Sequence, residues 1–383
     1  MDFTFTEEQL AVTEAAAAVF AGTSDPTRVA TVERSADRVD DELWSELAKA
    51  HLLGLAVPEE HGGSGLGLTE LCLVLEQQGR HVAPVPVWAT AVLGALPVAR
   101  FGSPAQRAAL LPAVAEGELR MSAALAGVAV GSRFVPTVAA TADGAGLRLT
   151  GTAAAVPQAH VAGRVLVPAR TADDGIVVAV VDPRAPSVSI ERATTTDRQI
   201  HPHLHFDGTP VGPDDLLGAP GEGEAVLRHL WERAVTGLCA LQLGVTEEAL
   251  RRAAAYLNQR QQFGRPLSSF QGTMLRAADA YVDTEAIRVT TWQAAWRLDT
   301  GRPADEAVVV AKWWASEAGQ RVVHATQHLH GGLGADTDYP IHRYFLWGKQ
   351  IELMLGGPAA QLAHLGALVT DGLRAGAHPG AGV

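Results

Sequence analysis

Three successive stretches of this chain carry different patterns of apolar residues, and their order restricts the folds that the chain can adopt. Up to about residue 120, and again from about residue 222, apolar residues recur at helical spacing. Between these stretches, short β-branched runs alternate with Gly, Pro and Asp clusters, which is typical of strands joined by turns. The sequence therefore predicts a mostly α-helical protein with a central β domain: a helical domain at 1–120, a β-barrel or sandwich at 121–221 and a bundle of four or five helices at 222–383.

Helix-start signals support the helical N-terminal part. Thr6 and Gln9 form a capping-box pattern ahead of an amphipathic segment. Ser103 stands before Pro104, as an N-cap residue stands before a proline at the first helical position. The repeat of apolar residues at 40–53 predicts a further helix between these two.

Composition excludes several classes of protein. The chain has 383 residues, 47% of them hydrophobic and 19% charged, which predicts a soluble globular protein with a large core. A net charge of −12 without a basic cluster argues against a nucleic-acid partner. The longest apolar runs, such as 91–99, are shorter than the roughly 18 residues that span a bilayer, and no basic segment precedes an apolar stretch at Met1. We therefore expect no membrane span and a cytoplasmic location, with Cys72 and Cys239 as buried thiols outside any disulfide framework.

Two glycine clusters do not indicate a doubly wound nucleotide fold. The clusters at 62–67 and 331–334 follow predicted helices. A Rossmann phosphate loop instead joins a strand to a helix.

The segment RQQFGRPLSSFQ at 260–271 resembles a flavin-binding segment of acyl-CoA dehydrogenases. The resemblance implies that Arg260 reaches the FAD pyrophosphate across a subunit interface, where a forked guanidinium suits phosphate oxygens. It also implies that Gln262 lies beside Arg260 and that Phe263 and Gln271 lie toward the adenosine. The alternative is that Arg260 only caps the end of its own helix.

A second segment, HATQHLHGGLG at 324–334, resembles the His-Gly-Gly turn of the same family. Backbone amides at Gly331 and Gly332 would approach the pyrophosphate, which requires residues without side chains. His328 stands where the family usually has a Gln, and Gln327 is its neighbour. Together the resemblances cover nearly the whole chain, and they imply the three-domain acyl-CoA dehydrogenase fold with a C-terminal four-helix bundle.

Two groups of histidines could also be interpreted as metal ligands. One group contains the i, i+4 spacing typical of a zinc-binding helix, but no carboxylate or fourth ligand accompanies it. The other alternates along a predicted strand, where a packed or solvated strand face is the simpler explanation. The two groups are His324, His328 and His330, and His201, His203 and His205.

The central β domain departs from the family at positions that would contact the flavin ring. The loop at 124–132 lacks most hydrogen-bonding residues of the family's loop. Ala155, Val156 and Pro157 align with a Trp-Ile-Thr segment that lies against the isoalloxazine in the family. The chain therefore keeps the residues that it would lend to a neighbour's flavin and lacks those that would hold its own flavin ring.

The chain also lacks the family's catalytic base. Abstraction of the proton α to a thioester requires a carboxylate in a dry pocket. The two family positions for that carboxylate are Gly356 and Ala234 here. Glu232 and Glu352 are weak candidates nearby, and a surface charge is the simpler explanation for each.

These losses resemble the non-catalytic subunit of the α2β2 acyl-CoA dehydrogenases of actinobacterial steroid catabolism. The segments DTDYPIHRYFLWGKQ at 336–350 and ELW at 42–44 match that subclass. The resemblance implies FAD at a subunit interface, a partner subunit that supplies the base, sterol or bile-acid side-chain CoA thioesters as substrates, and an electron-transferring flavoprotein as acceptor.

Three other functions stay open at this point. The chain could be a flavin-free structural or assembly subunit. It could be a self-sufficient homo-oligomeric dehydrogenase that uses Glu232 or Glu352. A flavin monooxygenase on the same scaffold is a further possibility that no residue favours.

Overall fold

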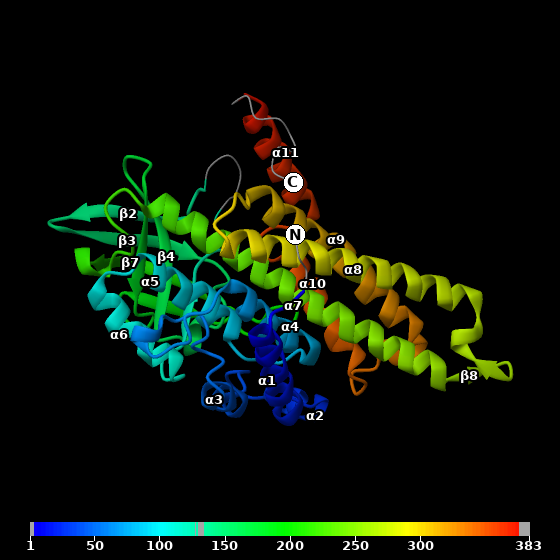
Figure 1. Cartoon of the computed structure of the whole chain (residues 1–383). Helices are drawn as coiled ribbons and strands as arrows, with labels where there is room; N and C mark the ends of the chain where they lie inside the picture. Colours follow the sequence, from blue (N-terminus) through cyan, green and yellow to red (C-terminus); the bar gives the residue numbers. More distant parts are fainter. Residues whose placement is uncertain (1–3, 127, 129–133, 375–383) are drawn as a thin grey trace. The chain divides into compact units, whose positions relative to one another are not determined.

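The computed structural model describes residues 4–126, 128 and 134–374, and it confirms the predicted fold class (Figure 1). Helices precede and follow a block of strands. The helices are α1 (Glu7–Thr23), α2 (Pro26–Val32), α3 (Asp41–Lys49), α4 (Leu68–His81), α5 (Leu96–Phe101), α6 (Pro104–Ala115), α7 (Gly223–Gln259), α8 (Gln271–Asp299), α9 (Asp305–Leu329), α10 (Ile341–Leu353) and α11 (Pro358–Arg374). The strands are β1 (Met121–Ala123), β2 (Val138–Asp143), β3 (Gly146–Ala153), β4 (Arg164–Thr171), β5 (Ile176–Val181), β6 (Val188–Glu191), β7 (His203–Val211), β8 (Gln261–Gln262) and β9 (Arg265–Pro266).

Both predicted helix starts are confirmed by their caps. The hydroxyls of Thr6 and Ser103 accept hydrogen bonds from the backbone N–H groups of Gln9 and Gln106, and both capping boxes are complete. The helix predicted at 40–53 is shorter than expected, because α3 ends at Lys49. His51 follows with a φ of +57°, which turns the next two leucines into the core.

Contacts divide the chain into two compact units. Unit 1 contains residues 1–31, 72–83 and 235–383, and unit 2 contains residues 32–71 and 84–234. This grouping cuts through the three predicted domains, whose bounds stay a prediction.

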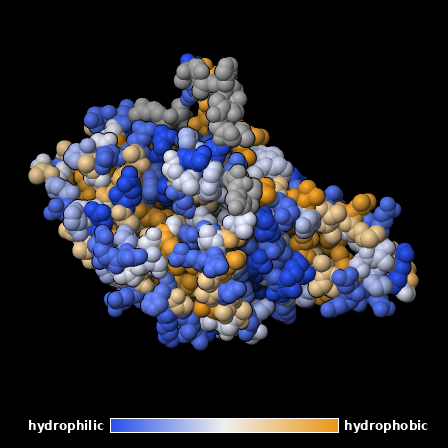
Figure 2. Space-filling view, viewed as in Figure 1, coloured by the Kyte–Doolittle hydropathy of each residue, from blue (hydrophilic) through white to orange (hydrophobic). Residues whose placement is uncertain are grey.

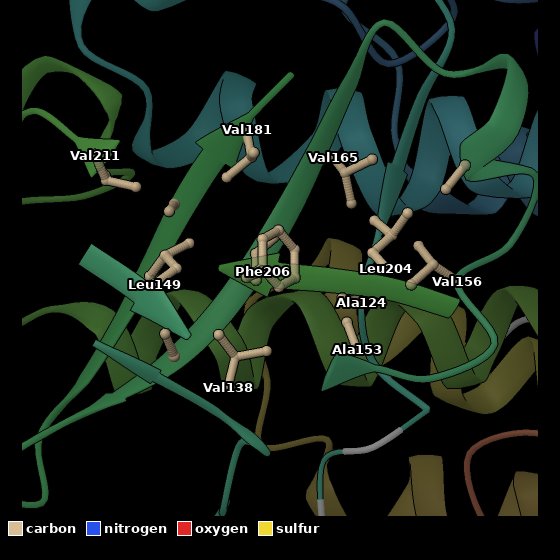
Figure 3. Close-up of a cluster of buried hydrophobic side chains, with 14 of the residues drawn as sticks. Ala124, Val138, Leu149, Ala153, Val156, Val165, Val181, Leu204, Phe206 and Val211 are labelled. Carbon is tan, nitrogen blue, oxygen red and sulfur yellow. The ribbon is translucent and has the colours of Figure 1, made fainter. Parts of the chain in front are cut away.

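In unit 2, seven described strands form one mixed sheet in the order β1-β4-β2-β3-β7-β6, with β5 on β4. Strands β1 and β2 run parallel to β4, and the other neighbours are antiparallel. Alternate residues of these strands point into a shared apolar core, as expected for a period of two. Figure 3 shows this core, including Val138, Leu149, Val165, Leu204 and Phe206.

In unit 1, α8 and α9 lie side by side and bury small residues against each other (Figure 1). Small side chains let helix axes approach closely. Gly319 shows how tight the packing is, since a Cβ added there would lie 2.0 Å from Nε2 of Gln242 on α7. The alanine-rich composition of α9 therefore serves helix packing.

The stretch from Ile341 to Arg374 is long and apolar enough to cross a membrane by length and composition. It is broken, however, because α10 ends at Leu353, Gly356 has a φ of +98°, and α11 begins at Pro358. The two helices contain 13 and 17 residues, whereas a spanning helix needs about 20. The stretch is therefore weak evidence for a membrane span.

Candidate flavin-side surface and base position

The family-like segment after α7 forms a hairpin that the sequence did not predict. Strands β8 and β9 pair Gln261 with Pro266, and Phe263 and Gly264 take φ values of +54° and +76° at the turn. The N–H of Leu267 donates to the carbonyl of Arg260 (2.8 Å) and closes the base of the hairpin. Phe263 is 92% exposed at the tip. An aromatic ring presented this openly is available to a molecule outside the chain.

The second family-like segment ends α9 at the same end of unit 1. The His330 ring stacks on Tyr256, one turn before Arg260, with ring centres 4.8 Å apart. Its Nδ1–H donates to the carbonyl of Thr326 (2.7 Å), and burial lowers the pKa of His330. A small apolar cluster around Leu257 and Leu329 packs beneath them. The structure thus brings together two motifs that are about 60 residues apart in the sequence.

The turn after α9 leaves its backbone accessible. Gly331 has a φ of +60°, which favours glycine, and a Cβ at Gly331 or Gly332 would meet no atom within 4 Å. Packing inside the described chain therefore does not explain these two glycines. Gln327 turns inward, where Nε2 donates to the carbonyl of Gly334 (2.9 Å), so His328 is the residue that faces outward.

The predicted flavin contacts lie on the surface of this end. Arg260, Gln262 and Gln271 are exposed, as are His328 and the two glycines. The alternative role of Arg260 as a helix cap finds no support, since the described part of the chain holds no hydrogen bond from its guanidinium. An exposed guanidinium, open backbone amides and an aromatic tip fit the phosphates and adenosine of a dinucleotide. These exposed residues form the surface at which FAD binding stays a prediction.

The first position of the missing base lies in the turn between α10 and α11. Leu355 and Gly356 take φ values of +54° and +98°. A Cβ at Gly356 would lie 2.9 Å from Nε2 of Gln361, which donates to the carbonyls of both turn residues (3.0 and 3.1 Å). The turn is built for glycine at this position.

A buried lysine that the sequence analysis missed holds the other side of this turn. The Lys312 Nζ donates to the Ser316 hydroxyl (2.7 Å) and to the carbonyls of Ile351 (2.8 Å) and Glu352 (3.2 Å). These carbonyls end α10 and have no partner within their helix, so a cation from α9 satisfies them. Complete burial lowers the pKa of Lys312 to about 8.

The second base position is an alanine, and each of the two candidate glutamates has a basic neighbour. Ala234 is fully buried, and its carbonyl accepts from Nε1 of Trp88 (3.0 Å). Glu232 faces Arg233 at 3.8 Å. Glu352 pairs with Lys349 on the same helix. Ion pairs of this kind are typical of structural charges.

In unit 2, the positions aligned with the family's flavin-ring wall belong to the core of the chain. Val156 is fully buried in the sheet cluster, and the carbonyl of Pro157 accepts from the Ser122 hydroxyl (2.6 Å). Ala155, with a φ of +45°, donates its N–H to His203 (3.1 Å). Of the family-like loop at 124–132, residues 127 and 129–132 lie outside the described residues.

Each described histidine of the two candidate metal groups has a separate environment. His205 contacts the Thr152 hydroxyl (2.9 Å) and Glu191 (2.9 Å), and His201 is buried. The His324 ring packs edge-on against Phe345. Over residues 4–126, 128 and 134–374, no three His, Cys, Asp or Glu side chains gather closely enough to hold a metal ion.

Comparison with known proteins finds two matching family models. The model of the acyl-CoA dehydrogenase N-terminal domain matches residues 6–118, and that of the C-terminal domain matches residues 222–368. The chain is 38% identical to acyl-CoA dehydrogenase FadE27 of Mycobacterium tuberculosis, over 96% of this chain and 98% of FadE27.

Two solved structures are similar over almost their full length. A variant of the Tcur3481–Tcur3483 steroid ACAD is 47% identical, with a TM-score of 0.90 over 96% of this chain and 99% of that one. A chain of the ChsE4–ChsE5 complex from Mycobacterium tuberculosis is 38% identical, with a TM-score of 0.91. The match covers 97% of this chain and 99% of that one. The chain belongs to the acyl-CoA dehydrogenases, a flavoprotein family of oxidoreductases.

Proposed function

We propose that this chain is a subunit of an FAD-dependent acyl-CoA dehydrogenase whose catalytic base comes from a partner chain. The observation that carries the proposal is a contrast between the residues that would contact the flavin and the residues at the two positions of the base. The flavin-side residues are exposed and side by side, whereas Gly356 and a buried Ala234 occupy the base positions.

The reaction needs a base and a hydride acceptor in one site. A partner carboxylate removes the proton α to the thioester, and the β carbon loses a hydride. FAD, when bound, would supply the hydride acceptor, and its electrons would pass to an electron-transferring flavoprotein. The residues of this chain would hold it: Arg260 would pair with the pyrophosphate, backbone amides at Gly331 and Gly332 would lie toward it, and Phe263 and Gln271 would lie toward the adenosine. Gln262 and His328 complete this edge.

The substrate class that we infer is a CoA thioester of a sterol or bile-acid side chain. The similarity to the Tcur3481–Tcur3483 steroid ACAD supports this class. The similarity to ChsE4–ChsE5, a complex of two named components, supports assembly with a second acyl-CoA dehydrogenase chain.

One observation favours a second candidate, a structural subunit without flavin. Val156, which aligns with the flavin-ring wall, is fully buried in the chain's own core. A chain that contributes only its fold to the complex would bind the partner without any flavin contact.

The Arg260→Ala variant distinguishes the two candidates when the chain is co-expressed with a base-bearing acyl-CoA dehydrogenase as partner. We expect the purified complex to keep its mass and to lose most of its flavin absorbance and turnover, because forked donors to the pyrophosphate are gone. Arg260→Lys keeps the charge and should recover flavin only in part. Arg251→Ala removes another exposed arginine of α7 and should change neither quantity. Full flavin in the Arg260→Ala complex would leave the structural role standing.

A further inference from the structure

A cavity in unit 1 contains none of the residues assigned to the flavin or to the base. It has a volume of about 220 Å³ and is lined by residues of α1, α2, α4, α7 and α10 and of the turns beside them. One water molecule needs only about 10–15 Å³, so the cavity can hold a larger molecule. Ala21 and Asp25 belong to its lining and are exposed, so the cavity opens to solvent.

The cavity is lined by two arginines that carry an excess of positive charge. Arg252 and Arg343 both belong to the lining, and Arg343 is only 5% exposed. Glu248, one turn before Arg252 on α7, pairs with Arg252 at 2.8 Å. The same carboxylate also accepts a hydrogen bond from Nη2 of Arg251 (2.7 Å). One buried carboxylate therefore serves two guanidiniums and leaves part of their charge without a counter-charge.

The one carboxylate among the described lining residues does not remove this excess. Oδ1 of Asp25 accepts from the backbone N–H groups of Thr27 (2.7 Å) and Arg28 (2.9 Å), and these bonds lower the pKa of Asp25. Asp25 is therefore ionised at neutral pH and lies at the exposed side of the cavity. Its charge and that of Glu248 together stand against three guanidiniums.

A buried hydroxyl also lines the cavity. Ser24 is 3% exposed, and its hydroxyl has no hydrogen-bond partner among residues 4–126, 128 and 134–374. Buried hydroxyls in native proteins are normally satisfied, by the protein, by water or by a ligand. His81 lines the cavity as well, and its Nδ1–H donates to the carbonyl of Gln77 (3.0 Å). Burial lowers the pKa of His81, so its ring is neutral near pH 7.

The surroundings of Arg252 hold its guanidinium in one place. The guanidinium carbon lies 5.3 Å from the ring centre of Tyr344, whose hydroxyl donates to the carbonyl of Arg80 (2.8 Å). A guanidinium that is fixed on an aromatic face can offer its remaining forked donors to an oxyanion. Figure 2 shows hydrophilic surface over much of the stretch that the second half of α7 occupies in Figure 1.

We propose that this cavity binds a small oxyanion, with Arg252 and Arg343 as charged donors and the Ser24 hydroxyl as a neutral donor. Phosphate and sulfate groups have this chemistry, whether free or carried on a small molecule. The site is independent of the proposed function, because its lining includes no flavin-side residue and no base position. Water alone is the competing occupant, since several water molecules would also satisfy Ser24.

The test is the binding of inorganic phosphate to the purified chain, measured by isothermal titration calorimetry in a phosphate-free buffer. Sodium chloride keeps the ionic strength constant, which removes the general effect of salt. Arg252→Gln and Arg251→Gln form a matched pair, because both arginines contact Glu248 and only Arg252 lines the cavity. A second pair changes volume instead of charge. Ala21→Phe fills the cavity from an exposed position of α1, and Ala18→Phe adds the same ring at an exposed position outside the lining.

We expect the wild type to bind phosphate at one saturable site and to unfold at a higher temperature when phosphate is present. Arg252→Gln should weaken binding at least about tenfold, because a hydrogen bond between charged groups is lost. Ala21→Phe should abolish binding. Arg251→Gln and Ala18→Phe should stay within about twofold of the wild type. Circular dichroism without phosphate verifies that each variant is folded, and Ala21→Phe decides the question if Arg252→Gln is not.

Three results would overturn the site. The absence of saturable binding by the wild type would mean that water fills the cavity. An equal loss in Arg251→Gln would reduce the binding to a general attraction between phosphate and arginines of α7. Binding that Ala21→Phe keeps and Arg260→Ala loses would place the phosphate at the flavin-side residues. The flavin content of the complex tests the proposed function separately from each of these results.

Discussion

At the residue scale, Gly356 is central to the proposal that the base comes from a partner chain. Gly356 has a φ of +98°, and Leu355 before it has a φ of +54°. The amide of Gln361 fills the space that a Cβ would enter. The backbone at this position therefore favours glycine over a residue with a side chain.

The variant Gly356→Glu should not restore a working base. A side chain in this backbone conformation costs about 1–3 kcal/mol, and the nearby amide must move as well. We expect a lower unfolding temperature and no acyl-CoA turnover by the chain alone, measured by calorimetry and an artificial electron acceptor.

Gly357→Glu is the matched control for that variant. A Cβ there would make ordinary contacts at 3.7 and 3.8 Å, so its unfolding temperature should change much less. Turnover by Gly356→Glu alone would mean that the turn accepts a base, which our account denies.

At the element scale, the C-terminal end of α10 depends on a buried cation from α9. Lys312 donates to the carbonyls of Ile351 and Glu352, and the Ser316 hydroxyl also donates to that of Glu352 (3.0 Å). The pKa of Lys312 is lowered from 10.5 to about 8 by burial. Between these values, the folded state holds fewer protons at this site than the unfolded chain does. The contribution of the site to stability therefore rises with pH in this window.

The variant Lys312→Met should remove this pH dependence. We expect the free energy of unfolding of the wild type, relative to Lys312→Met, to increase between about pH 8 and pH 10, as measured with urea. Lys49→Met, at a surface lysine that pairs with Glu46, should show a nearly constant difference over the same range. A constant difference for Lys312→Met would refute the burial of a titrating amine.

The same elements show what the sequence could and could not predict. The capping box at Thr6, the N-cap at Ser103 and a central block of strands were predicted, because caps and short β-branched runs are local signals. The hairpin after Arg260 was missed, since its strands have two residues each. Lys312 was missed because a lysine in a helix is usually exposed.

The candidate site was also predictable only as far as local sequence signals reach. The motifs around Arg260 and Gly331 indicated which residues to consider, and the stack of His330 on Tyr256 brings them to one end of unit 1. Their roles toward flavin stay predictions, because the molecule that they would contact lies outside this chain. No local pattern can report a contact with a second polypeptide.

At the scale of the whole molecule, two features carry the proposal of a shared catalyst. Arg260 and Phe263 are exposed at one end of unit 1, whereas Gly356 and the buried Ala234 occupy the proposed positions of the base. Each of these features has an explanation if a second chain supplies the missing part.

The most direct test of this claim is the visible spectrum, recorded with native mass and acyl-CoA turnover, of the chain purified alone and with its base-bearing partner. Our account predicts a colourless, inactive chain alone, and flavin absorbance, a mixed-subunit mass and turnover only for the pair. Stoichiometric FAD and turnover from the chain alone would contradict it and would return attention to Glu232 and Glu352.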